Sequence, residues 1–243
     1  MKSLGALAVP GANAGKEPEV EQLLKPGPGL PSARQPGIRQ PGDPHGHMSV
    51  DRLEQQLAFV RELDRLKTVL RRTSLIDRSR RENTAEHSWH LTAMALALAE
   101  YAPSGADLPH VVEMLVVHDM VEIDAGDTFA FDVSANLDKG ARETAAAQRL
   151  FGLLPPDVGD RLRACWEEFE ANETPSARFA NALDRLQGLI VNDAPGDGGT
   201  WKLHGVSRGQ VLERMAPIET GAPGLWPVVV EAIERAVEAG HIA

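Results

Sequence analysis

A buried helical run that ends in a histidine and an aspartate constrains this chain more than any other feature of its sequence. Residues 111–117 are almost entirely apolar, and His118 and Asp119 follow them directly. A carboxylate at the end of such a run is costly to bury unless a cation receives it. A neutral imidazole beside a carboxylate is a ligand pair for a first-row metal ion, and such an ion would be that cation. The run therefore predicts half of a metal site, and another part of the chain must supply the other half.

Two more acidic residues follow the His-Asp pair. Glu122 lies three residues after Asp119, on the same face of a continuing helix. Gly126 is expected to end that helix, which leaves Asp127 on the loop beyond it. A purely structural metal site has no use for extra acids, so Glu122 and Asp127 are candidate catalytic residues.

A second helix, expected over residues 176–193, carries a matching acid. It is apolar nearly all round, and Asp184 lies in the middle of it. A buried carboxylate needs an arginine, a hydrogen-bond network or a metal ion as its partner. Arg185 is the alternative to a metal, but adjacent helix positions point about 100° apart and do not face each other. We therefore favour Asp184 as a metal ligand.

A histidine begins the buried face of a third helix. Asn83 and Glu86 have the spacing of a capping box, which predicts a helix to about Tyr101 with His87 in its first turn. Apolar residues follow His87 at helical spacing, so its imidazole is expected to be buried. A lone histidine there would more often be a hydrogen-bonded core residue, and the later His-Asp pair favours a ligand instead. His90 is the rival ligand, because a His-x-x-His pair could also bind a metal.

The first 47 residues differ in composition from the rest of the 243-residue chain. Prolines and glycines alternate there without any apolar period, so we expect residues 1–47 to form a dispensable disordered tail. Residues 48–243 are enough for one domain. A short apolar segment near the start faintly resembles a secretory signal, but Gly5 and Pro10 interrupt it.

The bulk composition excludes several classes of protein. The formal net charge of −10 argues against binding to a nucleic-acid polymer. The single cysteine, Cys165, rules out a disulfide within the chain and favours a reducing compartment such as the cytoplasm. Cys165 itself is expected to be an ordinary helix residue. No apolar run approaches the ~20 residues that a membrane helix needs, so no membrane partner is expected.

Five arginines lie within eleven residues of one another, shortly before the first histidine candidate. Such a cluster is usually a solvated face. In an acidic protein, and beside a candidate ligand, an anion-binding role is about equally favoured. The five are Arg71, Arg72, Arg78, Arg80 and Arg81.

The rest of the pattern is helical, with no strand pattern of useful length, so the expected fold class is all-α. An irregular stretch at residues 128–136 contains Phe129 and Phe131 and is a candidate lid or substrate wall. Residues 194–206 are expected to form a loop. The other expected helices span residues 51–70, 107–119, 137–151, 156–172, 207–219 and 224–240.

Taken together, these motifs resemble the HD superfamily of metal-dependent phosphohydrolases, whose ligands are a histidine, a His-Asp pair and a later aspartate, all on helices. Residues 82–88, 117–127 and 179–185 resemble more narrowly the bacterial 5′-deoxynucleotidases and the related eukaryotic HD-domain proteins. The resemblance covers about residues 51–220. It implies an all-α HD-domain helical bundle around a single divalent metal ion (Mn, Co, Fe, Zn or Mg), often in a homodimer.

The resemblance also assigns roles to individual residues. No histidine lies between Asp119 and Asp184, whereas the two-metal branches of the superfamily need additional histidines there, so one metal ion is expected. The implied metal ligands are His87, His118, Asp119 and Asp184, the implied catalytic acids are Glu122 and Asp127, and the implied phosphate-contacting arginine is Arg72, with Arg78 and Arg81 as candidate helpers.

One position departs from the resemblance. The nucleotidases of the family carry a tryptophan after the phosphate arginine, where this chain has Thr73. That difference leaves the sugar preference and the contact with the base open.

The function implied is that of a 5′-nucleotidase, which hydrolyses (deoxy)nucleoside 5′-monophosphates to nucleoside and phosphate. In this scheme Glu122 activates the water, and Asp127 either protonates the leaving oxygen or holds the sugar. The alternatives are hydrolysis of another phosphoester or of a pyrophosphate by the same residues, and a non-catalytic metal-stabilised regulatory protein.

Overall fold

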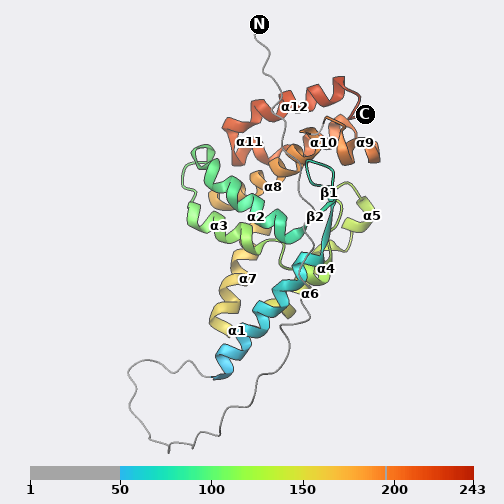
Figure 1. The fold of residues 1–243 in the computed structure, drawn as a ribbon. Helices are drawn as coiled ribbons and strands as arrows, with labels where there is room; N and C mark the ends of the chain where they lie inside the picture. Colours follow the sequence, from blue (N-terminus) through green and yellow to red (C-terminus); the bar gives the residue numbers. More distant parts are fainter. Residues whose placement is uncertain (1–49, 195) are drawn as a thin grey trace, which may run out of the picture. The chain divides into compact units, whose positions relative to one another are not determined.

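The computed structural model describes residues 50–194 and 196–243. The expected tail at residues 1–47 lies outside the described residues. Within them the protein is a bundle of α-helices with one small two-stranded sheet (Figure 1), which confirms the all-α class. None of the described helices is long and apolar enough to cross a membrane.

The bundle is organised around α8 (Pro175–Asp193), which packs against helices from both halves of the sequence (Figure 1). Phe179 and Leu183 are fully buried in this helix. One of its contact partners, α11 (Pro217–Gly221), approaches α8 so closely that a β-carbon at Gly221 would lie 2.1 Å from the carbonyl oxygen of Arg178. A glycine is required there because only hydrogen fits between the two backbones.

The first expected helix is shorter than its apolar pattern indicated. It ends at Leu63 in α1 (Val50–Leu63) and continues as a 3₁₀ helix, η2 (Asp64–Thr68). Two strands that the sequence did not indicate follow it, β1 (Leu70–Ser74) and β2 (Arg81–Asn83), paired in antiparallel register. Strands this short and this rich in arginine carry no readable alternation of apolar residues, which is why the pattern missed them.

The helix that carries His87 begins where the capping box predicted. The backbone N–H of Glu86 donates to Asn83 Oδ1 at 2.9 Å, and the backbone N–H of Asn83 donates to Glu86 Oε2 at 3.2 Å. Both bonds satisfy donors that a helix start would otherwise leave unpaired. The helix α2 (Thr84–Ala97) is followed by a single 3₁₀ turn, η3 (Ala99–Tyr101).

The helix that leads to the His-Asp pair stops just before it. α3 (Leu108–Val117) begins after Asp107 as expected, and the four residues from His118 to Val121 form turns rather than regular helix. The short α4 (Glu122–Ala125) then ends at Gly126, whose φ of 72° lies in the left-handed region. The expected continuous helix is therefore broken at the His-Asp pair, and glycine ends it where the sequence indicated.

The remaining helices follow the predicted order, with three differences. The stretch expected to be irregular, residues 128–136, ends in a short helix. The expected loop at residues 194–206 contains a short helix, and the helix expected at 207–219 is divided in two before Pro217. These helices are α5 (Val133–Asn136), α6 (Lys139–Phe151), α7 (Pro156–Ala171), α9 (Gly199–His204), α10 (Arg208–Met215), η4 (Pro223–Leu225) and α12 (Trp226–Glu238).

Candidate metal centre

Three separate segments bring the four predicted ligands together. His87 Nε2 lies 3.1 Å from Asp184 Oδ1 and 3.7 Å from Asp119 Oδ2, and His118 Nε2 lies 3.1 Å from the same Asp119 oxygen. One ligand atom each from His87, His118 and Asp119 falls within 4.8 Å of the others. Two imidazoles and two carboxylates so close together, without sulfur, form a donor set that suits a divalent first-row metal ion.

The buried nitrogen of His118 fits a bound cation. His118 Nδ1 lies 3.0 Å from the carbonyl oxygen of Leu115, so Nδ1 carries a hydrogen and donates it. Nε2 is buried and makes no hydrogen bond, although it faces the Asp119 carboxylate. Burial lowers the pKa of His118, but Asp119 outweighs burial and the pKa is raised. The same negative charge that stabilises a proton on Nε2, between the ring and the carboxylate, would also stabilise a metal ion bound there in place of the proton.

Both ligand carboxylates are held in their ionised form. Burial opposes ionisation of Asp119, but His118 and then Arg71 outweigh it and depress its pKa. Burial also opposes ionisation of Asp184, and Arg185 and His87 outweigh it, so this pKa is lowered as well. The imidazole of His87 is neutral, because burial and then Arg71 lower its pKa to about 4. Ionised carboxylates and neutral imidazoles are the forms that bind metals.

The expectation that Arg185 would not face Asp184 is wrong. The guanidinium of Arg185 forms an ion pair with Asp184 Oδ2, and Arg214 from α10 lies 3.9 Å from the same oxygen. The long arginine side chain turns back over the helix surface, which a comparison of Cα directions does not capture. The other oxygen, Oδ1, remains directed at His87.

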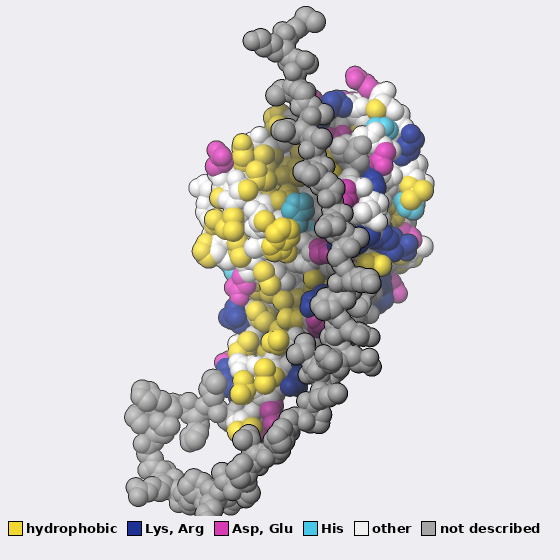
Figure 2. All heavy atoms as spheres, viewed as in Figure 1, with side chains coloured by type: hydrophobic (Ala, Val, Ile, Leu, Met, Phe, Trp, Pro, Cys, Tyr) yellow, Lys and Arg dark blue, Asp and Glu magenta, His cyan; other side chains and the backbone are white. Residues whose placement is uncertain are grey.

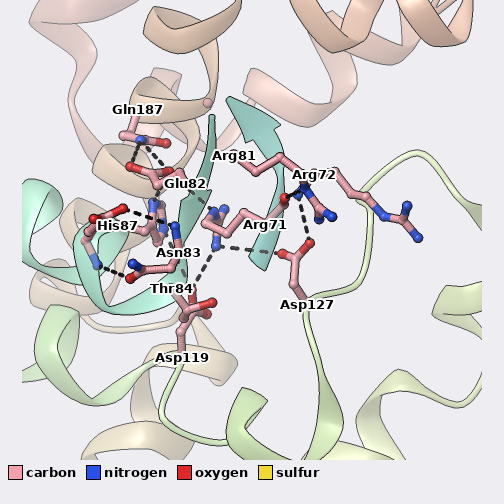
Figure 3. Close-up of polar contacts among 12 residues, drawn as sticks. Arg71, Arg72, Arg81, Glu82, Asn83, Thr84, His87, Asp119, Asp127 and Gln187 are labelled. Carbon is pink, nitrogen blue, oxygen red and sulfur yellow. Dashed lines mark hydrogen bonds and ion pairs between the residues drawn. The ribbon is translucent and has the colours of Figure 1, made fainter. Parts of the chain in front are cut away.

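Arg71 is the residue of this centre that the sequence did not single out. It extends from β1, and Nη1 donates to Asp119 Oδ2 at 3.0 Å and lies 3.8 Å from Asp127 Oδ1 (Figure 3). Its Nε lies 3.7 Å from Glu82 Oε2, and only 16% of its side chain is exposed. Side chains alternate between the two faces of a strand, so Arg71 points inward and its neighbour Arg72 outward. The sequence could not show this difference between Arg71 and Arg72, because it did not reveal the strand.

Of the three predicted substrate arginines, Arg72 borders the site, and Arg78 and Arg81 have other partners. Arg72 contacts the site through its backbone N–H, which donates to Asp127 Oδ2 at 3.2 Å, while its side chain lines an adjoining pocket. Arg78 pairs with Asp197, and Arg81 donates to the carbonyl oxygens of Leu70 and Arg71. None of these three guanidinium groups contacts the four ligands within the described part of the chain.

The two candidate catalytic acids border the same cavity as the ligands. Glu122 is 5% exposed and accepts a hydrogen bond from Thr84 Oγ1 at 2.8 Å. Burial, followed by the neighbouring charges of Asp119 and Asp127, raises the pKa of Glu122 well above its ordinary value. Burial also raises the pKa of Asp127, against the opposing effect of Arg71. Both acids line the cavity together with His118 and Asp119.

A buried glutamate, itself hydrogen-bonded to a glutamine, lies on the Nδ1 side of the His87 ring. Both carboxylate oxygens of Glu82 accept hydrogen bonds of 3.0 Å from Gln187 Nε2, and Glu82 Oε2 lies 3.7 Å from His87 Nδ1 (Figure 3). At this distance the contact is electrostatic, and His87 Nδ1 has no hydrogen-bond partner among the described residues. The nearby carboxylate favours a hydrogen on Nδ1, which would leave Nε2 available to a metal ion. Glu82 belongs to the segment 82–88 that carried the resemblance, but its role was not recognised.

His90, the rival ligand, lies outside the candidate metal centre, and the candidate lid residues Phe129 and Phe131 line a pocket beside it. His90 stacks on Trp89, with ring centroids 6.4 Å apart and planes at 29°, and is not among the residues that could share a metal with His87. Phe129 and Phe131 contact each other edge to face and line a pocket that opens beside the centre. Thr73 lines the same pocket.

Comparison with known proteins places this geometry in a family. Residues 63–226 match the family model of the HD domain, so the chain belongs to the HD domain family.

A crystal structure described as a predicted metal-dependent phosphohydrolase from Magnetospirillum magnetotacticum MS-1 is 52% identical in sequence. It superposes with a TM-score of 0.75 over 79% of this chain and 99% of that one. The curated 5′-deoxynucleotidase HDDC2 of Homo sapiens is 29% identical over 136 residues, 55% of this chain and 65% of that protein. Its Xenopus laevis counterpart is 31% identical over 136 residues, 55% of this chain and 66% of that protein. The chain therefore spans just under two thirds of the length of these two curated relatives.

The centre is expected to hold one metal ion per chain. Replacing a ligand residue on either side of the centre should abolish binding of that ion. In elemental analysis of protein purified without chelator, His118→Ala and Asp184→Ala should each lose one equivalent relative to the unsubstituted chain. The matched control is His90→Ala, which should keep the ion because His90 stacks outside the centre. A loss of two equivalents, or undiminished metal in both ligand variants, would contradict a mononuclear centre at these residues.

Proposed function

We propose that the protein is a metal-dependent phosphohydrolase that acts on nucleoside 5′-monophosphates, in either the ribose or the deoxyribose form. The observation that carries the proposal is the pair Glu122 and Asp127, which line one cavity with the metal ligands and have raised pKa values. A metal site that only stabilised the fold would not need two buried acids with perturbed pKa values beside it. The similarity to 5′-deoxynucleotidases supports the choice of substrate.

The residues divide the reaction between them. His87, His118, Asp119 and Asp184 would hold a divalent ion, which would supply positive charge for the phosphate. Glu122 orients the attacking water and accepts its proton. Burial and the neighbouring carboxylates raise its pKa and favour its protonated form, and the positive charge of a bound ion would favour the ionised form that this role needs.

Asp127 carries the proton to the leaving 5′-oxygen or holds the sugar hydroxyl, and its raised pKa favours the protonated form that the first role needs. Arg71 takes the phosphate, because its guanidinium already reaches the oxygen atoms of Asp119 and Asp127.

One observation favours a second class of substrate. Arg185 and Arg214 both line the cavity beside Asp184, so two guanidinium groups besides Arg71 border it and could contact further phosphate oxygens. The pKa of Arg214 is lowered to about 10, first by burial and then by repulsion from the like charge of Arg185. A diphosphate or triphosphate ester would place additional negative charge between these two side chains.

The proposal is tested by phosphate or pyrophosphate release from AMP, dAMP, dADP and dATP with Mn²⁺, Co²⁺ or Mg²⁺. The expected result is metal-dependent release of phosphate from a monophosphate. Preferential hydrolysis of dADP or dATP would select the second class, and no hydrolysis of any nucleotide would reject both.

Replacement of Glu122 by glutamine separates chemistry from metal binding. The amide keeps the shape but cannot accept a proton, so kcat should fall by roughly 10²–10⁴-fold while the metal content stays unchanged. The measurement is single-turnover hydrolysis by the metal-loaded variant. Asp124→Asn on the same short helix is the matched control, because Asp124 pairs with Arg149 away from the centre. Near-wild-type turnover in Glu122→Gln would assign the base to another residue, with Asp127 next.

We also propose that the protein is a homodimer in a reducing, cytoplasmic environment. Apolar side chains gather over α2 and α3 (Figure 2), where Trp89 is 72% and Leu96 is 63% exposed. An apolar patch of this kind favours a protein partner, and a second copy is the simplest one.

Sedimentation velocity of the unsubstituted chain should give twice the monomer mass. Leu96→Glu should give the monomer mass, because it places a charge in the interface. Leu203→Glu, at an equally exposed leucine on α9, should leave the dimer intact. A monomeric unsubstituted chain would contradict the proposal.

A further inference from the structure

A second cluster of metal-binding side chains lies at the opposite end of α3 from the His-Asp pair. His110 and Glu113 lie three residues apart on α3, and Cys165 faces them from α7. One ligand atom from each of these three residues lies within 4.8 Å of the others. None of them contributes to the centre described above.

The orientation of His110 leaves one ring nitrogen available. Its Nε2 lies 2.8 Å from Glu168 Oε2, and Glu168 in turn accepts a hydrogen bond of 2.6 Å from Thr174 Oγ1. A carboxylate bonded to Nε2 holds the hydrogen there and leaves the lone pair on Nδ1. Nδ1 lies 3.7 Å from Glu113 Oε2. Two ligands at about 2.0–2.3 Å from one tetrahedral ion are separated by roughly this distance.

We propose that His110, Glu113 and Cys165 form a second, mononuclear site for a thiophilic divalent cation such as Zn²⁺, between α3 and α7. The imidazole, the carboxylate and the thiolate would be three ligands, with water as the fourth. Glu168 would be the residue that orients His110 by its hydrogen bond. An imidazole and a thiolate together select zinc-like ions over magnesium or calcium.

Binding requires two local exchanges, both of which the surroundings allow. Cys165 is buried, and burial raises the pKa of its thiol to about 11, which opposes loss of the proton. The metal ion must therefore displace this proton to solvent as the sulfur–metal bond forms. Glu113 forms an ion pair with Arg161, and this pair must open. Arg161 is 59% exposed and returns to water, where a surface ion pair contributes little.

Such a site would join the helix that positions His118 and Asp119 to its neighbour in the bundle. α3 and α7 are in direct contact, and the His-Asp pair follows the last residue of α3. An ion bound by both helices stabilises the folded state by the free energy of its binding. The role inferred is therefore structural support of the helix that ends at the metal centre.

The single thiol of the chain gives the test an unambiguous signal. Co²⁺ is titrated into the full chain, and the thiolate-to-cobalt charge-transfer absorption in the near ultraviolet is recorded. Only Cys165 can produce this band, because the first metal centre contains no sulfur and the sequence has one cysteine. The expected result is a band that saturates by two added equivalents in the full chain, because the first centre also binds Co²⁺. In His118→Ala, which removes a ligand of the first centre only, the band should persist and saturate at one equivalent, and in Cys165→Ser it should be lost.

Further variants distinguish a built site from a cysteine that binds cobalt alone. His110→Gln and Glu113→Gln change partly exposed side chains, with His110 31% exposed, and each should abolish or strongly weaken the band. Glu168→Gln should weaken affinity by roughly 10–100-fold, since it removes the group that orients His110. Arg161→Gln should strengthen binding by removing the competitor for Glu113. No band at saturating Co²⁺, or a band of equal affinity in His110→Gln and Glu113→Gln, would overturn the proposal.

Discussion

One guanidinium connects the parts of this protein that form its candidate metal centre. Arg71, from a five-residue strand, meets carboxylates of β2, of the turn after α3 and of the loop after α4. Burial lowers the pKa of Arg71, but the surrounding carboxylates, Asp119 foremost, outweigh burial and raise it, so the side chain stays charged. Three buried or half-buried acids can lie together because this cation lies between them. Without Arg71, the negative charges of Asp119 and Asp127 would raise the pKa of Glu122 further above its ordinary value.

The helices supply the rigidity that this charge cluster needs. α8 is buried among helices from both halves of the chain, so Asp184 is carried by the least mobile kind of element in the fold. The capping box fixes the start of α2 one turn before His87. α3 ends immediately before His118, which allows His118 and Asp119 to point at one ligand position and Glu122 to point at the adjacent cavity. Three elements that are distant in sequence therefore converge on one small volume.

The sequence predicted the helices well and the small polar details poorly. The structure brings the four predicted ligand residues together, and their role as metal ligands stays a prediction. Periodicity and caps locate long helices, and a buried acid such as Asp184 is visible because it interrupts an apolar face. The hairpin was missed because short arginine-rich strands carry no apolar alternation, and the choice between Arg71 and Arg72 depends on which face of β1 each occupies. Similarly, the contacts of Asp184 with Arg185 and Arg214 depend on the rotamers of long side chains, which a sequence does not contain.

The central claim is that Arg71, rather than Arg72, is the cation that assembles the centre and receives the phosphate. The most direct measurement is kcat/KM of metal-loaded Arg71→Gln and Arg72→Gln, with the nucleotide that the unsubstituted protein hydrolyses fastest. Loss of a charged contact to the transferred phosphate costs on the order of 10²-fold or more, so Arg71→Gln should fall by at least that factor. Arg72→Gln should change by less than about tenfold, because its guanidinium lies in the adjoining pocket. The reverse order of the two effects would contradict the account.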